Sequence, residues 1–192
     1  MPPPLPARHP EGPRRPALVR MAWLFYVPMI AAGAFAQPPG VLRVAEPFVL
    51  AEGLAAALAG AALTVIASRW VARHTGWGRG LRDEFRHVLG ALGSRQILAV
   101  SLLSGFGEEL LFRGVLQGWF GLGWTALLFG LFHFPVRRSL IPWTLFAAVL
   151  GLALGALTEW TQTVWPAILL HFAVNYFNLH DLVEGERGTT AR

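Results

Sequence analysis

The chain has 192 residues, of which 54% are hydrophobic and 14% are charged, and its mean hydropathy is +0.48. Soluble domains carry about 25% charged residues, so this balance excludes an ordinary soluble protein and predicts an integral membrane protein. The net charge is +5, but no basic and aromatic platform for nucleic acid is present, and the lack of cysteine excludes disulfides, thiolate metal sites and a cysteine nucleophile.

The apolar segments predict an all-α fold, a polytopic transmembrane helical bundle. A bilayer core about 30 Å thick needs about 20 apolar residues per helix, so the chain has room for about six spans plus one interfacial amphipathic helix. Strand-like alternation is absent, and helices satisfy their own backbone hydrogen bonds in lipid. We divide the chain into a disordered, Pro- and Arg-rich cytoplasmic arm (1–20), a membrane domain (21–180) and a polar tail (181–192).

The first two spans are predicted at 21–36 and 48–70. Ala34-Phe35-Ala36 follows a basic arm and also fits a signal-peptide cleavage site, and this alternative stays open. The second span is rich in small residues that suit close helix contact. Glu52, near its start, is interpreted as an interfacial carboxylate.

Residues 71–95 interrupt the apolar run with several arginines. Apolar residues recur in this segment at helical spacing: Leu81, Phe85, Val88, Leu89 and Leu92. The pattern predicts a short amphipathic helix on the membrane surface, with a soluble linker helix as the alternative.

Three charged residues stand inside the third span, predicted at 96–118: Glu108, Glu109 and Arg113. A charge at membrane depth costs at least about 2.5 kcal/mol, so each of them needs a partner or a function. Glu109 and Arg113 are four residues apart and can pair on one helix face. Glu108 then lies about 100° round the helix and can point elsewhere.

Histidine and asparagine side chains occupy two later spans. The fourth span, 120–135, contains Phe129 and His133, whose spacing lets the phenyl ring shield the imidazole from lipid. The sixth span, 163–179, contains His171 and Asn175, again four residues apart. We expect each pair to share one helix face.

The fifth span, 140–158, is predicted to be a packing helix. It is apolar and rich in small residues, with Gly151 and Gly155 at the spacing that allows two helices to approach closely.

Arginine counting predicts the orientation. All sixteen basic residues are arginine, and with both termini inside, fourteen of them face the cytoplasm. Arg43 then lies outside and Arg113 lies within the membrane. The absence of lysine beside abundant Ala, Gly and Arg suggests a GC-rich bacterial genome. We therefore expect a multi-pass protein of a bacterial inner membrane, with its N- and C-termini in the cytoplasm.

Tryptophans near the span ends indicate depth. The loops between spans three and four and between spans five and six are both flanked by Trp, and both are expected on one side of the membrane. At 1.5 Å per residue from these tryptophans, Glu108, His133 and Asn175 lie about 14–16 Å deep and His171 lies about 9 Å deep. Four polar side chains from three helices are therefore expected in one layer.

Such a set of side chains can hydrolyse a bond with an activated water. Glu108 could deprotonate a water that His133 holds, while His171 and Asn175 could donate hydrogen bonds to the oxyanion of a tetrahedral intermediate. Taken singly, the histidines could be core residues, the glutamates a proton relay, and the asparagine an interhelical hydrogen-bonding group. Their coincidence at one depth favours a catalytic site.

In these residues the chain resembles the CPBP (Abi) family of intramembrane proteases, which includes CAAX prenyl endopeptidases and bacteriocin-processing or immunity proteins. The family pattern of Glu-Glu-x-x-x-Arg, Phe-x-x-x-His and His-x-x-x-Asn occurs in order at 108–113, 129–133 and 171–175. The resemblance covers about residues 96–180. It implies Glu108 as catalytic base with His133 as its partner, His171 and Asn175 at the oxyanion, and supporting roles for a further set: Glu109, Arg113 and Phe129.

The resemblance also implies a reaction and its partners. We expect an intramembrane endopeptidase that acts, within membrane lipid, on a membrane-associated protein or peptide such as a prenylated CAAX protein. Members of the family are often labelled metalloproteases; Glu108, His133 and His171 could form a three-ligand zinc set, or could work without a metal, and both remain open. The alternatives are a non-catalytic protein of bacteriocin self-immunity or partner binding, and a proton-coupled carrier.

Overall fold

Every element in the described part of the chain is a helix, which confirms the predicted all-α class. The computed structural model describes residues 15–36, 38, 40–89, 92–133 and 137–187. The helices are α1 (Arg15–Ala36), α2 (Pro47–His74), α3 (Gly76–Leu89), α4 (Ser94–Leu111), α5 (Gln117–Phe132), α6 (Ile141–Thr161) and α7 (Trp165–Arg187). A π-helical turn, η1 (Phe112–Leu116), joins α4 to α5, and a short 3-10 turn, η2 (Arg138–Leu140), precedes α6.

Four helical stretches of the described chain are long and apolar enough to cross a membrane: 18–36, 47–74, 94–132 and 138–161. The third stretch contains both α4 and α5, because helical turns continue through η1. The chain reverses at Gly121, whose φ of 73° and ψ of 172° are accessible to glycine and strained for other residues. Helix α7, which carries His171 and Asn175, is not among the four. A count of about six spans therefore stays a prediction.

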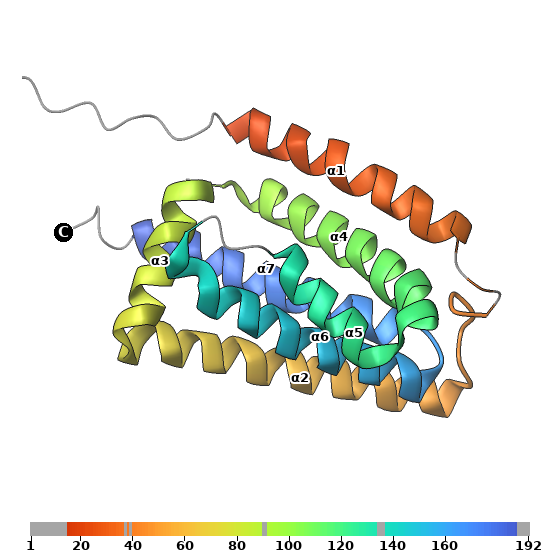
Figure 1. Cartoon of the computed structure of the whole chain (residues 1–192). Helices are drawn as coiled ribbons and strands as arrows, with labels where there is room; N and C mark the ends of the chain where they lie inside the picture. The colour runs from red at the N-terminus through yellow and green to blue at the C-terminus, as the bar shows by residue number, and fades with distance from the viewer. Residues whose placement is uncertain (1–14, 37, 39, 90–91, 134–136, 188–192) are drawn as a thin grey trace, which may run out of the picture.

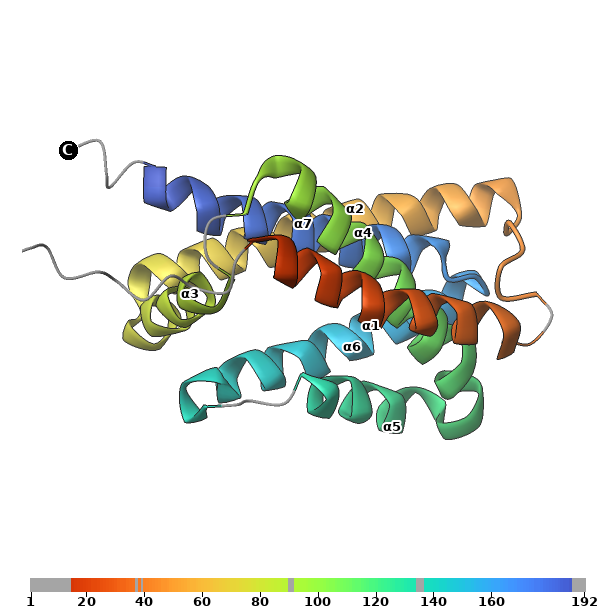
Figure 2. The same cartoon turned by 90° about the horizontal axis from the view of Figure 1, so that it is seen from above.

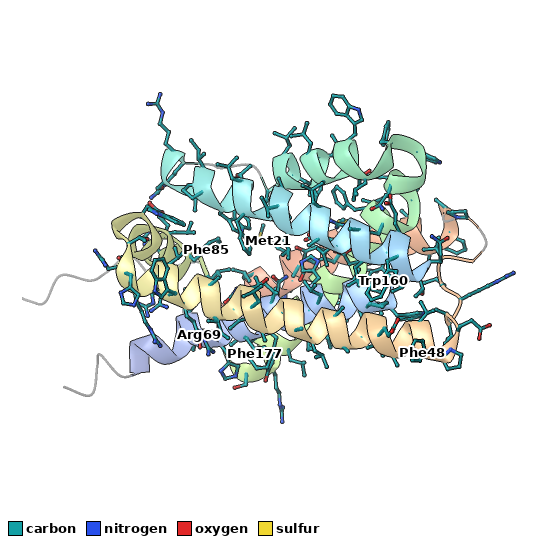
Figure 3. The ribbon with its side chains drawn as sticks, turned by 90° about the horizontal axis from the view of Figure 1, so that it is seen from below. Met21, Phe48, Arg69, Phe85, Trp160 and Phe177 are labelled. Carbon is teal, nitrogen blue, oxygen red and sulfur yellow. The ribbon has the colours of Figure 1, made fainter. Side chains whose placement is uncertain are left out.

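Helix α4 lies inside the bundle, between α1 on one side and α7 on the other. Helix α2 packs on α7, and α5 packs on α6 (Figures 1 and 2). The turn between α4 and α5 and the turn between α6 and α7 lie at the same end of the bundle, as the tryptophan pattern predicts. Helix α3 lies at the opposite end, with the start of α1 and the end of α7 (Figure 1). Phe48 and Trp160 mark the first end, and Arg69 and Phe85 lie toward the second (Figure 3).

Two helices extend past the predicted domain boundaries. Helix α1 begins at Arg15, inside the segment 1–20 that was predicted to be a disordered arm. Helix α7 continues to Arg187, through the first part of the predicted polar tail. Asp181 forms an ion pair with Arg69 of α2, and Val183 is buried, so this last segment packs on the bundle. Residues 1–14 and 188–192 lie outside the described residues.

The predicted amphipathic helix is present as α3. It lies against the start of α6, where Phe85 meets the Trp143 ring edge-on at 5.0 Å and Glu84 accepts a hydrogen bond from Arg137 at 3.0 Å. The side chain of Val88 lies outside the described residues. The location of α3 at the membrane surface stays a prediction.

Helix α6 packs as its glycines predict. A Cβ on Gly151 would lie 3.2 Å from Cδ1 of Phe129, and one on Gly155 would lie 2.4 Å from Cδ1 of Leu122. Because α6 approaches closely, two of its backbone carbonyls accept hydrogen bonds from side chains of η1 and α5. Arg113 Nη2 donates to the Gly151 carbonyl at 2.9 Å, and Gln117 Nε2 donates to the Gly155 carbonyl at 3.0 Å. Polar groups of the site are thus anchored on α6 backbone.

Candidate active site

Helix α4 carries four buried polar residues, two of which, Ser104 and Glu109, contact α7: Ser101, Ser104, Glu108 and Glu109. Glu108 is 4% exposed and Glu109 is fully buried, as is Ser101. A buried charge is costly unless hydrogen bonds and opposite charges surround it. The partners of the two carboxylates therefore define the site.

Glu109 forms the ion pair that its spacing predicts. Arg113 Nη1 lies 3.0 Å from Glu109 Oε1, and neither side chain is exposed. The guanidinium also lies over the face of Phe129, with its carbon 4.2 Å from the ring centroid. A delocalised cation on an aromatic face in a dry interior is a favourable arrangement. Phe129 therefore supports Arg113 in addition to shielding an imidazole.

His171 of α7 joins the two glutamates. Its Nδ1 lies 2.7 Å from Glu109 Oε1, and its Nε2 lies 3.9 Å from Glu108 Oε2. A carboxylate oxygen only accepts, so the Nδ1 atom of His171 donates to it. This contact sets the ring orientation and directs Nε2 toward Glu108.

His133 approaches the same carboxylate from α5. It is the residue that follows the last turn of α5, and its Nδ1 lies 2.7 Å from the Phe129 carbonyl oxygen. That carbonyl accepts the Nδ1 proton, so Nε2 of the neutral ring carries a lone pair. The Nε2 atom lies 3.6 Å from Glu108 Oε2, and the His133 side chain is 14% exposed. The ring is packed between Phe129 and Trp143.

The two oxygens of Glu108 have different surroundings. Oε1 accepts a hydrogen bond from the Tyr26 hydroxyl at 2.9 Å. Oε2 is buried and has no hydrogen-bond partner among the described residues, although the Nε2 atoms of His133 and His171 lie 3.6 and 3.9 Å away. A buried acceptor without a partner is unfavourable and calls for a bound water or substrate atom. Oε2 is therefore the carboxylate oxygen that faces both imidazoles.

Asn175 lies one turn of α7 beyond His171. Its Nδ2 donates to Ser104 Oγ at 2.9 Å, and Ser104 precedes Glu108 by four residues just as Asn175 follows His171 by four. Because α4 and α7 run in opposite directions, the two pairs meet side by side (Figure 2). Of the four predicted site residues, Glu108, His133 and His171 come together, and Asn175 adjoins them.

Sequence reasoning missed two of these partners. Tyr26 comes from the first span, where the only available signal was a phenolic hydroxyl inside an apolar helix. Ser104 is not among the predicted site residues; its hydroxyl accepts a hydrogen bond from Asn175. Gln117 is also buried, and it donates to the Gly155 carbonyl and to Glu159.

In this arrangement, Glu108, His133 and His171 are not grouped as a three-ligand metal site. No three His, Cys, Asp or Glu side chains of the described chain are placed so that they could hold a metal ion.

Part of the chain is similar to a known protein family and to one curated protein. Residues 92–177 match the family model described as type II CAAX prenyl endopeptidase Rce1-like. The chain is also 40% identical over 81 residues to the uncharacterized protein YpbD of Bacillus subtilis (strain 168), a match that covers 41% of this chain and 41% of that protein. The chain thus matches about two fifths of the length of this curated relative. No solved structure matches it.

The matched segment contains α4, α5, α6 and the part of α7 that bears His171 and Asn175. Both glutamates, the arginine and both imidazoles of the cluster therefore lie within it. Residues 92–177 are therefore similar to the family described as type II CAAX prenyl endopeptidase Rce1-like, which supports the resemblance to the CPBP intramembrane proteases.

Proposed function

We propose that this protein is an intramembrane endopeptidase that cleaves a peptide bond of a membrane-associated protein with a water activated by Glu108 and His133. The observation that carries the proposal is the buried Oε2 atom of Glu108. It lacks a hydrogen-bond partner in the described structure and lies within 3.9 Å of Nε2 of two imidazoles from two other helices. A water beside these atoms would meet one carboxylate acceptor and one imidazole acceptor.

The reaction begins with a water that donates one hydrogen bond to Glu108 Oε2 and the other to His133 Nε2. Glu108 takes a proton from the water while the oxygen of that water attacks the scissile carbonyl carbon. The carbonyl π bond becomes the oxyanion of a tetrahedral intermediate. When the carbon–nitrogen bond breaks, the protonated Glu108 returns its proton to the leaving amine, and a new carboxyl group and a new amine are released.

His171 is suited to stabilise the oxyanion if its ring is an imidazolium. Its Nδ1 already donates to Glu109, so Nε2 can donate only when it also carries a proton. Glu108, Glu109 and Arg113 together have a net charge of −1, and an imidazolium makes the buried cluster neutral. The remaining amide proton of Asn175 is the second donor that we assign to the oxyanion.

The substrate class follows from the location of the site and from the family. A cluster buried among membrane-spanning helices meets substrates that enter from lipid, such as a lipid-anchored protein tail or a membrane peptide. A prenylated CAAX-type protein is the substrate we propose first. We place the protein in the inner membrane of a bacterium, with both termini cytoplasmic and with membrane lipid around the bundle.

The test compares purified wild-type protein with Glu108→Gln in lipid vesicles. We expect the wild type to cleave a lipidated CAAX-type peptide, and Glu108→Gln to lose at least about 100-fold in kcat. Glu52→Gln is the matched control, since Glu52 is exposed on α2. Proteomic comparison of cells that express the two proteins identifies natural peptides cut near the membrane.

Three outcomes would change the conclusion. A Glu108→Gln protein that keeps the full cellular phenotype supports non-catalytic partner binding, as in bacteriocin self-immunity. Uptake driven by a pH gradient, without cleavage, supports a carrier. Metal in the purified protein, with activity lost on chelation and restored by zinc, would assign the water to a metal instead of to Glu108 alone.

A further inference from the structure

Tyr26 lies on α1, outside the segment that matches the family, yet it contacts the proposed catalytic base. Its hydroxyl donates to Glu108 Oε1 at 2.9 Å across a separation of 82 residues. The Tyr26 ring packs on the main hydrophobic core of the bundle. This hydroxyl is the hydrogen-bond donor that Glu108 has among the described side chains, because its other oxygen has no partner there.

Glycines bring α1 and α4 close enough for this contact. A Cβ on Gly107, next to Glu108, would lie 3.0 Å from Cδ1 of Tyr26. On the other helix, a Cβ on Gly33 would lie 2.7 Å from the Cβ of Leu110. Each helix therefore presents a glycine where the other has a side chain. The Tyr26 ring therefore packs directly on the backbone of α4 at Gly107.

We propose that Tyr26 is a positioning residue for Glu108 in the hydrolytic reaction. The inference rests on the proposed function. A carboxylate has two oxygens that exchange places by rotation about its last bond. The tyrosine hydroxyl holds one of them as Oε1 and so presents the other to the two imidazoles. The tyrosine hydroxyl has a single proton and an ionised carboxylate only accepts, so the hydroxyl is the donor in this hydrogen bond.

The proposal assigns α1 to the working enzyme. A site made from α4, α5 and α7 alone would have a base that is free to rotate toward Arg113 or His171. With α1 in place, Glu108 is held between a hydroxyl on one side and the water position on the other. The active protease would therefore retain α1, because Tyr26 orients the carboxylate of Glu108.

The test replaces Tyr26 with Phe, which removes one oxygen and keeps the ring. Tyr176→Phe is the matched control, since it changes the chain's other tyrosine, which is half-buried and stacks on Phe172. We expect Tyr26→Phe to lower kcat for the peptide about 10- to 100-fold with KM within about twofold, because misorientation of a reacting group costs rate rather than binding. Tyr176→Phe should keep the wild-type kcat.

A vibrational measurement separates positioning from a structural effect. The infrared difference spectrum between wild type and Tyr26→Phe should contain a shifted carboxylate stretching band. The same difference taken in the Glu108→Gln background should lack that band, because the affected carboxylate is then absent. Thermal unfolding of both single variants checks that the bundle stays intact.

The outcomes distinguish this inference from the proposed function. An active wild type, an inactive Glu108→Gln and a fully active Tyr26→Phe overturn the role of Tyr26 and leave the protease proposal standing. A carboxylate band that persists in the Glu108→Gln background also overturns it. A Glu108→Gln protein with wild-type activity overturns both proposals together.

Discussion

Nδ1 of His171 lies 2.7 Å from Oε1 of Glu109, the residue beside the proposed base. One imidazole thus faces both members of the acidic pair, since its Nε2 lies 3.9 Å from Glu108 Oε2. Glu109 therefore has two partners, His171 and Arg113, whereas Glu108 has Tyr26 and a free oxygen. Adjacent glutamates of the same chemistry have different environments, and their substitutions should have different effects.

Glu109→Gln should destabilise the fold. The change leaves the buried guanidinium of Arg113 without its closest counter-charge, and breaking a buried ion pair costs about 3–5 kcal/mol. The measurement is the free energy of unfolding of the purified protein in detergent. Glu52→Gln, on the exposed face of α2, should stay within about 0.5 kcal/mol of wild type. Equal stability of the Glu109 and Glu52 variants would contradict the buried ion pair.

His133→Ala should lower activity with little loss of stability. The hydrogen bond of the His133 side chain runs to a carbonyl of its own helix, so its removal costs mainly the edge-on contact with the Trp143 ring. We expect kcat to fall about 100- to 10,000-fold, as for loss of a proton-transfer partner. Peptide cleavage and the unfolding midpoint are measured on one preparation. An inactive protein that also unfolds much earlier would indicate a structural role for the imidazole.

Gly130→Ala should disturb the site through packing alone. A Cβ on Gly130 would lie 2.6 Å from the Cβ of Ala148 and 3.0 Å from the Thr144 carbonyl oxygen, so α5 must move away from α6. Overpacking of this kind costs about 1–3 kcal/mol, and it displaces His133 three residues later. The control is Gly123→Ala on the same helix, where an added Cβ meets nothing within 4 Å. The free energy of unfolding and kcat should both fall for Gly130→Ala, and neither should fall for Gly123→Ala.

Ser104→Ala should act through Asn175. The Ser104 hydroxyl accepts the hydrogen bond from Asn175 Nδ2 at 2.9 Å and so orients the amide that we assign to the oxyanion. We expect Asn175→Ala to lower kcat about 100- to 1,000-fold, as for loss of an oxyanion donor, and Ser104→Ala to lower it less. In the Asn175→Ala background, Ser104→Ala should have no further effect on kcat. Additive losses would show that the two residues act separately.

The sequence by itself determined the features that depend on local spacing and composition. Hydropathy predicted an all-α membrane bundle, because a helix in lipid must be apolar along its length. The four-residue spacing predicted the pair of Glu109 and Arg113 and the packing role of Gly151 and Gly155, since both follow from the periodicity of one helix. The extension of α7 past residue 180 was not predicted, because it depends on contacts with other helices such as the ion pair of Asp181 with Arg69.

Only the tertiary structure decided which polar atoms meet. That Tyr26 holds Glu108, that Asn175 contacts Ser104, and that His171 gives its Nδ1 proton to Glu109 depend on the rotation and relative register of separate helices. These are set by close contacts at small residues such as Gly107, where two helices approach without an intervening side chain. Helical periodicity constrains a single segment, and it says nothing about how far one segment is turned toward another.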